Sequence, residues 1–352
     1  MANPLDDRQF VTRLDPKGMY DLTVAFPDQC REALAIAKAV SLPRMAPQNI
    51  VLTGLGGSAA GGDFAKACFD AEGAIPFSVN RDYHLPSWVD EHTVVFATSY
   101  SGNTEETLSA YADAARVGAR RIVITSGGKL AGLAEADGSP VIRIPGGQPP
   151  RTALGFMLIP VLQACSALGW LEDLQFDKTF VLLDQCVADW GVDVPIQDNP
   201  AKQLAVALQG KVSVLYGLGG WQAIVANRWK GQINENAKNM TFANAFPELN
   251  HNEILGWVLA DQQGVNSWAC VVLQDGTESA KMQARRDVTA RLIERVATTH
   301  RVQAKGDSLL ERMMSLVLMG DFVSLYLAAM NGVDPENIDS INVLKSELAQ
   351  VQ

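Results

Sequence analysis

The feature that most constrains the fold is a pattern that occurs twice: an apolar strand, a glycine-rich turn and a helix. One copy, VLTGLGGSAAGGDFAK, begins at Val51, and the other, VLYGLGGWQAIVANRWK, begins at Val214, so that Gly-Leu-Gly-Gly aligns at 54–57 and 217–220. Apolar strands that alternate with longer helical patterns indicate a parallel sheet with helices on both faces. The repeat therefore predicts an α/β protein with two related domains in tandem.

The predicted boundaries follow from the segment between the two copies. GVDVPIQDNP, at 191–200, is polar and contains prolines, which is typical of a linker. We expect an N-terminal helical segment over 1–45, a first domain with its following helices over 46–190, and a second domain with C-terminal helices over 200–352. The apolar stretch from 313 to 330 has the length of a membrane span, but a glycine, an aspartate and two serines interrupt it, which favours a buried core helix.

Composition narrows the class of partner. The chain has 352 residues and a formal net charge of −10, without the clustered Lys and Arg that nucleic acids and anionic membranes require, so neither is expected as a partner. Its cysteines have no metal-like spacing, and the polar start MANPLDDRQF does not resemble a signal peptide. We expect no metal, a cytoplasmic protein and five free thiols, at Cys30, Cys68, Cys165, Cys186 and Cys270.

The segment SYSGNTEETL, at 99–108, crowds hydroxyl groups where an apolar strand passes into a helix. Ligands of open parallel sheets bind at the carboxyl ends of the strands, where helix N-termini offer unpaired N–H groups to anions. Ser99, Ser101 and Thr104 add hydroxyl groups there, and Gly102 lets the backbone come close. These residues predict a phosphate site.

The turn GLGGSAAGG adds Gly57 and Ser58 at the neighbouring strand end. For a single turn, helix capping by Ser101 or Asn103 is an equally good interpretation, but two such turns in one domain favour phosphate. Neither turn is a dinucleotide fingerprint, and no Walker lysine is present. The second domain continues into DGTESAKMQ at 275–283 instead, so we expect one phosphate site per chain.

Acid–base chemistry needs other residues, and two carry the strongest signal. His251 lies in FPELNHNEILGW among polar and carboxylate side chains, whereas the other three histidines are typical of surface or packing positions. Glu235 lies sixteen residues before it, near the end of the helix that follows the second glycine-rich turn. Taken alone, a glutamate in that place is more often a solvated helix residue.

Six motifs, in this order, together resemble one family: GLGGSAAGGDF, SYSGNTEET, PPRTALGFM, QINENAK, ELNHNEILGW and GVDPENIDSINVLKSEL. They are similar to those of the bifunctional phosphoglucose/phosphomannose isomerases of the sugar isomerase (SIS) superfamily. The resemblance implies two SIS domains, each with a five-stranded parallel sheet between helices in a flavodoxin-like three-layer sandwich. It also implies interconversion of glucose 6-phosphate or mannose 6-phosphate with fructose 6-phosphate, without cofactor, in a homodimer whose active sites take residues from both subunits.

The resemblance also assigns roles to residues. It places the phosphate loop on the residues already singled out: Gly57, Ser58, Ser99, Ser101 and Thr104. By the family's arrangement, the catalytic base falls on Glu235, and the ring-opening group falls on His251 and is presented to the partner's active site. A cation beside the enediolate falls on Arg151, and a group near the sugar ring falls on Lys345.

The chemistry agrees with these roles. One carboxylate can take a proton from one carbon and return it to the next, a fixed guanidinium stabilises the enediolate, and a histidine can move a proton during ring opening. Glu248 and Glu253 flank His251 and are the alternative bases. The resemblance further implies a hydroxyl near the C-terminal segment that helps accept the C2 epimer. No equivalent threonine stands out in VDPENIDSIN, so the preference between the glucose and mannose epimers stays open.

Two other functions remain open from the sequence. SIS domains also serve as sugar-phosphate sensors, which lack catalytic residues or carry a DNA-binding segment. An isomerase of another phosphosugar is the second alternative, although such relatives commonly have one SIS domain or an added glutaminase domain.

Overall fold

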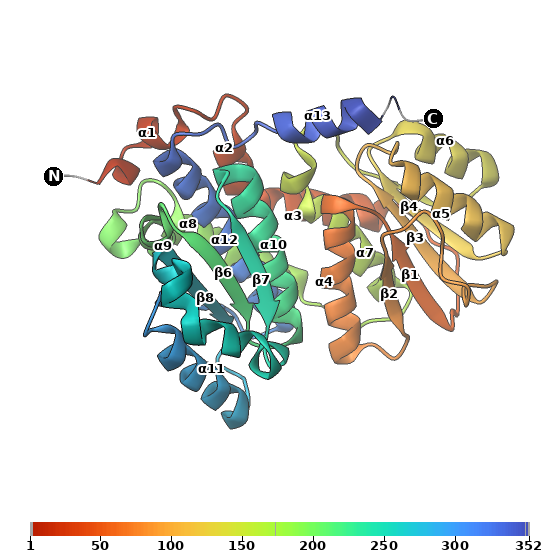
Figure 1. Ribbon diagram of the computed structural model, residues 1–352. Helices are drawn as coiled ribbons and strands as arrows, with labels where there is room; N and C mark the ends of the chain where they lie inside the picture. Colours follow the sequence, from red (N-terminus) through yellow and green to blue (C-terminus); the bar gives the residue numbers. More distant parts are fainter. Residues whose placement is uncertain (1–2, 173, 349, 351–352) are drawn as a thin grey trace. The chain divides into compact units, whose positions relative to one another are not determined.

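The computed structural model describes residues 3–172, 174–348 and 350, and its chain divides into two compact units (Figure 1). The five-stranded unit comprises residues 25–184 and 306–311, and the four-stranded unit comprises residues 1–24, 185–305 and 312–352. The outermost residues of the predicted first and last segments, 1–2 and 351–352, lie outside the described residues. Both units contain a parallel sheet with flanking helices, which confirms the predicted α/β class.

The five-stranded unit has a parallel sheet in the order β2-β1-β3-β4-β5. Its central strands are built from uninterrupted apolar runs, and every residue of β3 is buried, because helices cover both faces of the sheet. The strands are β1 (Asn49–Thr53), β2 (Phe77–Asn80), β3 (Thr93–Ser99), β4 (Arg120–Thr125) and β5 (Val141–Arg143).

The order reverses between β1 and β3, so right-handed crossovers place α4 on one face and α5 and α6 on the other (Figure 1). Helix α7 packs against α3 and α4. The carboxyl ends of β1 and β3, at the reversal, are where this topology offers a ligand site. The helices are α3 (Phe26–Ala39), α4 (Gly56–Glu72), α5 (Glu105–Arg116), α6 (Gly128–Asp137), η2 (Pro150–Thr152), α7 (Leu154–Ala167) and α8 (Phe176–Trp190), which ends in the other unit.

The four-stranded unit repeats this layout with the order β7-β6-β8-β9. Its strands are β6 (Val212–Gly217), β7 (Thr241–Ala245), β8 (Trp268–Gln274) and β9 (Thr298–Gln303). Its helical elements are η1 (Pro4–Asp6), α1 (Arg8–Thr12), α2 (Met19–Val24), η3 (Ile196–Asp198), α9 (Pro200–Leu208), α10 (Gly220–Ala237), η4 (Glu248–His251), η5 (Glu253–Gln263), η6 (Val265–Ser267), α11 (Ala280–Ile293), α13 (Asp339–Leu348) and α12 (Leu309–Asn331), which begins in the other unit.

The prediction of five strands in each sheet is wrong for this unit, since the described residues form four. After β9 the chain enters α12 and then a segment rich in Asp, Asn and Glu. That last segment lacks an apolar run from which a fifth buried strand could form. Helix α12 is long and apolar enough to cross a membrane, but 94% of its most apolar window is buried within the structure, as expected of a core helix.

Residues 1–24 group with the four-stranded unit, and residues 25–45 group with the five-stranded unit. The predicted ranges treated 1–45 as one separate segment. Lys202 accounts for part of this grouping. Its side chain is fully buried, and its ammonium donates to the carbonyls of Val192 and Val194, at 2.8 and 2.7 Å, and to Asp6 Oδ1 at 3.0 Å. A buried ammonium needs such partners, and one of them comes from η1. The five cysteines are free and buried.

Candidate active site

The hydroxyl-rich turn lies between β3 and α5 in the five-stranded unit. Ser99, at the last position of β3, is buried, and its Oγ lies 2.9 Å from Thr104 Oγ1 and accepts the Gly102 N–H at 3.1 Å. Thr104 is the N-cap residue of α5, but its hydroxyl makes no capping hydrogen bond to the helix. Ser101, by contrast, is exposed and accepts the Asn103 N–H at 3.2 Å. The expected hydroxyl groups therefore do gather where α5 begins.

The glycine-rich turn after β1 contacts this first turn directly. Ser58 Oγ, in the first turn of α4, accepts the Tyr100 N–H at 3.1 Å. Gly102 has a φ of +69°, and a Cβ at that position would stand 1.8 Å from the carbonyl oxygen of Gly127. Only glycine fits there, because both the left-handed backbone and the close approach exclude a side chain. Two strand ends and two helix N-termini thus meet at one place, as anion sites require.

Arg151 lies beside the same turns. It belongs to η2, and its side chain is buried. A Cβ on Gly57 would stand 2.7 Å from the Pro150 carbonyl oxygen, so η2 packs directly on the start of α4. Gln29 holds the segment in place, since it donates to the Thr152 carbonyl at 2.9 Å and accepts the Gly155 N–H at 2.8 Å. The structure therefore brings one buried cation next to the predicted phosphate residues.

Glu235 lies in the last turn of α10, in the four-stranded unit, and is partly buried. The helix is fixed on both sides of it. Asn236 Nδ2 donates to Ser324 Oγ of α12 at 2.9 Å, and Asn234 exchanges two hydrogen bonds with the backbone of Thr241 at the start of β7. The backbone of the predicted base is consequently anchored to a neighbouring helix and a neighbouring strand.

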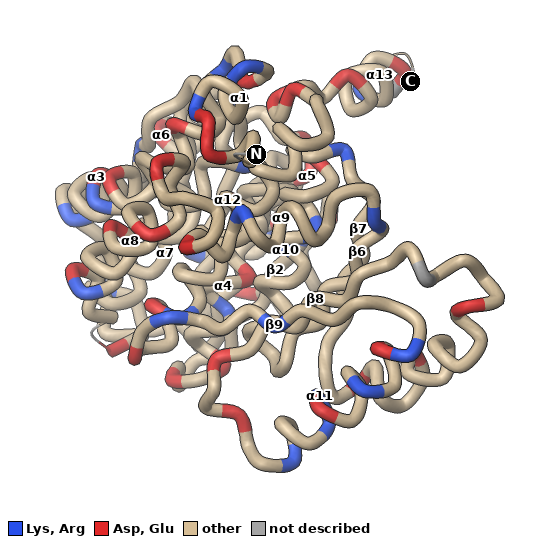
Figure 2. Tube along the Cα trace, turned by 90° about the vertical axis from the view of Figure 1, so that its left-hand side faces the viewer, with Lys and Arg blue, Asp and Glu red and all other residues tan. Residues whose placement is uncertain are grey.

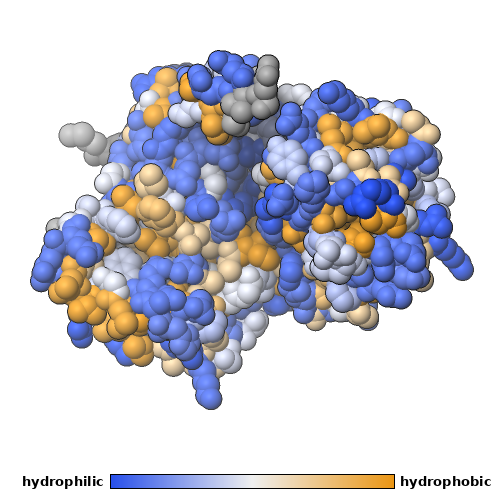
Figure 3. Space-filling view, turned by 45° about the vertical axis from the view of Figure 1, so that its right-hand side comes forward, coloured by the Kyte–Doolittle hydropathy of each residue, from blue (hydrophilic) through white to orange (hydrophobic). Residues whose placement is uncertain are grey.

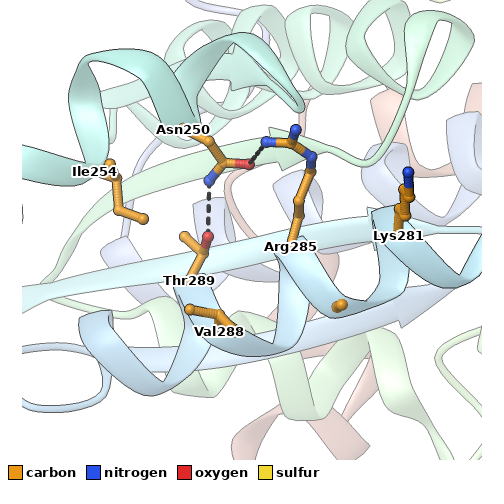
Figure 4. Close-up of a pocket in the computed structure, with 7 residues that line it drawn as sticks. Asn250, Ile254, Lys281, Arg285, Val288 and Thr289 are labelled. Atoms are coloured by element: carbon orange, nitrogen blue, oxygen red, sulfur yellow. Dashed lines mark hydrogen bonds between the residues drawn. The ribbon is translucent and has the colours of Figure 1, made fainter.

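His251 ends η4 in the same unit, and its side chain is exposed. The preceding residue, Asn250, holds η4 against α11: it donates to Thr289 Oγ1 at 2.9 Å and accepts from Arg285 at 3.5 Å (Figure 4). These residues line a surface cavity of about 440 Å³, to which Ile254 and Val288 add apolar side chains. The exposed imidazole of His251 is therefore carried by a segment, η4, that is held against α11 by hydrogen bonds.

The two glutamates that flank His251 have other partners. Glu253 accepts from the Tyr216 hydroxyl and from Asn244 Nδ2, the latter at 2.5 Å. Burial, and then Glu253 itself, raises the pKa of Tyr216 far above its usual range, so the phenol remains a donor. Glu248 accepts from Asn252 at 3.1 Å. Glu253 therefore has a structural role in holding η5 to the sheet, which the sequence pattern did not reveal.

The remaining predicted residue, Lys345, lies on α13 with an exposed side chain. The predicted residues are thus distributed over both units. Gly57, Ser58, Ser99, Ser101, Thr104 and Arg151 lie in the five-stranded unit, and Glu235, His251 and Lys345 lie in the four-stranded unit. Lys238, three residues after Glu235, was not singled out by sequence reasoning, although the motif QINENAK ends on it.

The fold and its two glycine-rich turns define a class: proteins with tandem SIS domains. A model of the SIS domain matches residues 45–143, and a model of the bacterial phospho-glucose isomerase C-terminal SIS domain matches residues 197–348. Among solved structures, a hypothetical protein of Thermus thermophilus has the same fold, with a TM-score of 0.74 at 17% identity over 98% of this chain and 93% of its own.

Curated relatives narrow the class to a family. A bifunctional phosphoglucose/phosphomannose isomerase of Caldicellulosiruptor bescii is 42% identical over 95% of this chain and 100% of its own length. An enzyme of Thermoplasma acidophilum with the same name is 34% identical over 86% of this chain and 90% of its own. The chain belongs to the bifunctional phosphoglucose/phosphomannose isomerase family.

Proposed function

We propose that this protein interconverts glucose 6-phosphate, mannose 6-phosphate or both with fructose 6-phosphate through an enediol or enediolate. Family membership supports the isomerase activity, and one structural observation supports the hexose phosphate: the hydroxyl-bearing turns of α4 and α5 meet beside the buried Arg151. Backbone N–H groups and hydroxyls at two helix N-termini suit a phosphate dianion without a lysine.

The proposed division of labour follows from the chemistry. The carboxylate of Glu235 takes the proton from one of the two carbons C1 and C2 and returns it to the other, which needs a firmly held base. The guanidinium of Arg151 stabilises the enediolate oxygens without acting as an acid, because it remains protonated. His251 moves a proton between the ring oxygen and the C1 hydroxyl, and Lys345 lies near the sugar ring.

We also propose that the protein is a homodimer in which His251 serves the active site of the partner subunit. Three apolar residues of η5, which follows His251, are more than half exposed: Leu255, Val258 and Leu259 at 69, 70 and 53%. Figure 3 shows that one face of the protein carries hydrophobic patches among hydrophilic side chains. An apolar surface of this kind is typical of an interface, and a second copy would cover it next to the histidine.

Complementation tests the shared site. Glu235→Gln and His251→Gln homodimers are each expected to be nearly inactive. When the two are unfolded together and refolded as a 1:1 mixture, half of the dimers are mixed and each has one intact site, so about a quarter of wild-type activity should return. A mixture as inactive as its components would mean that both residues serve the site of their own chain.

The reaction itself is tested by proton NMR of the purified protein with fructose 6-phosphate in D2O. Both aldose epimers should be followed, with deuterium expected at C2 of the product. Product without deuterium would contradict exchange of the enediol proton with solvent. Binding of fructose 6-phosphate without product would favour a sugar-phosphate sensor instead.

We further propose that the protein is cytoplasmic.

A further inference from the structure

The carboxyl end of α10 is held by a lysine in an unusual way. Lys238 is the C-cap residue of this helix, with φ of 51° and ψ of 37°. Left-handed backbone of this kind disfavours residues other than glycine and asparagine. A lysine at such a position indicates that its side chain makes contacts that glycine could not make.

The Lys238 ammonium binds backbone carbonyls of two segments. It donates to the carbonyl oxygen of Glu235 at 2.7 Å and lies 3.5 Å from that of Asn236, both in the last turn of α10. It also donates to the carbonyl oxygens of Asp334 and Pro335, at 2.6 and 3.3 Å. These last two residues belong to the loop that joins α12 to α13.

The contacts matter because carbonyls of the last helical turn lack partners within the helix. Asn331 Nδ2, at the end of α12, donates to the next carbonyl, that of Ala237, at 3.0 Å. Side chains therefore bind three successive carbonyls, of residues 235–237, and Lys238 joins this turn to the α12–α13 loop. The Lys238 ammonium also interacts favourably with the negative pole of the α10 dipole.

We propose that Lys238 is a positioning residue: its ammonium fixes the backbone of Glu235, and with it the direction of the carboxylate, against the α12–α13 loop. This inference rests on the proposed function, in which Glu235 is the base. Proton transfer depends steeply on the geometry of the base, and substrate affinity comes from the phosphate turns of the other unit. Loss of Lys238 should therefore lower kcat more than it changes KM.

Three substitutions separate positioning from stability. Lys238→Met keeps the aliphatic stem and removes the ammonium, Lys238→Arg keeps a cation with several donors, and Lys238→Gly removes the ammonium but relieves the left-handed backbone. Lys211→Met is the matched control, because Lys211 is a lysine of the same unit whose ammonium donates to Thr298 Oγ1 instead.

We expect kcat for fructose 6-phosphate to fall at least tenfold in Lys238→Met and Lys238→Gly, with KM within about threefold of wild type. Lys238→Arg should recover most of kcat, and Lys211→Met should match wild type. The Tm of Lys238→Gly should equal or exceed that of wild type, because glycine favours this backbone. Amide hydrogen exchange in residues 232–239 should be faster in both variants that lack the cation.

Contrary results are equally distinct. A Lys238→Gly protein with kcat within twofold of wild type would overturn the inference, as would equal losses in the Met and Arg variants or unchanged hydrogen exchange at 232–239. A wild-type protein without isomerase activity would overturn the proposed function, and the positioning of a base with it. Failure of the proposed function shows in the wild type, whereas failure of the positioning inference shows only in the variants, so the two are distinguishable.

Discussion

Arg228 Nη2 lies 3.1 and 2.9 Å from the two carboxylate oxygens of Asp321, and the pair joins α10 to α12 in the interior of the four-stranded unit. Gln232, which lies one helical turn after Arg228 on α10, donates from Nε2 to Asp321 Oδ1 at 2.7 Å. Burial raises the pKa of Asp321, and Arg228 opposes that rise. These contacts fix the helix that carries Glu235.

Removing one partner of this pair should destabilise the protein strongly. Asp321→Ala leaves the Arg228 guanidinium buried without its carboxylate, which costs about 3–5 kcal/mol of unfolding free energy. The double variant Arg228→Met with Asp321→Leu should recover most of that loss, because it leaves no buried charge. Urea denaturation of Arg228→Met, Asp321→Leu and the double variant measures the coupling between the two side chains, and strictly additive losses would argue against a linked pair.

Glu235→Gln tests the base directly. The amide keeps the size of the side chain but cannot accept the substrate proton, so kcat should fall by about 10²–10⁴-fold while fructose 6-phosphate still binds. Glu253→Gln is the matched control, since Glu253 lies near His251 in sequence but accepts from Tyr216 and Asn244. We expect the control to lose stability rather than turnover. Near-normal turnover in Glu235→Gln would remove Glu235 from the mechanism.

The phosphate turn should control affinity. Removing both hydroxyls in Ser99→Ala/Thr104→Ala should raise KM for fructose 6-phosphate by about 10- to 100-fold, because hydrogen bonds to a charged group are lost. Steady-state kinetics measures KM and kcat together, and kcat should change less. Thr107→Val is the control: this buried hydroxyl of α5 makes no hydrogen bond among the described residues. A kcat loss with unchanged KM in the double alanine variant would contradict phosphate binding.

His300, on the edge strand β9, should make stability depend on pH. Burial, and then the charge of Lys211, lowers the pKa of His300 below its usual 6.5. The unfolded chain therefore takes up a proton at a higher pH than the folded chain does, and stability falls as the pH drops below about 6.5. His300→Gln cannot titrate, so its loss of stability from about pH 7.5 to about pH 5.5 should be smaller than that of wild type.

Urea midpoints at several pH values compare the two proteins. His92→Gln serves as the control, because the His92 side chain is 55% exposed. Parallel pH dependences of wild type and His300→Gln would contradict the lowered pKa of this half-buried imidazole.

Much of the fold could be predicted because its signals are local. The apolar runs of β1 and β3 and the glycine-rich turns lie within short windows, and each appears in the structure where expected. The gathering of Ser58, Ser99 and Thr104 was predictable for the same reason: parallel topology brings neighbouring strand ends together. The roles of the site residues remain predictions.

Other features could not be predicted because they depend on contacts between distant segments. Figure 2 shows acidic and basic residues scattered along the whole chain, and nothing in their order indicates that Asp321 pairs with Arg228 or that Lys202 reaches Asp6. The strand count of the second sheet is a similar case: the family resemblance implied five strands, whereas the described residues form four.

Local patterns were enough to establish the α/β class, the tandem repeat and the turn that crowds hydroxyl groups at a strand end, since strand, turn and helix signals act over a few residues. Packing of the folded chain was needed to show which charged groups are buried in pairs, which glutamate near His251 is bound to Tyr216, and that Lys238 joins the helix of Glu235 to the loop after α12. The physical reason is that burial and hydrogen bonding at these residues depend on partners tens of residues away, which only packing brings within reach.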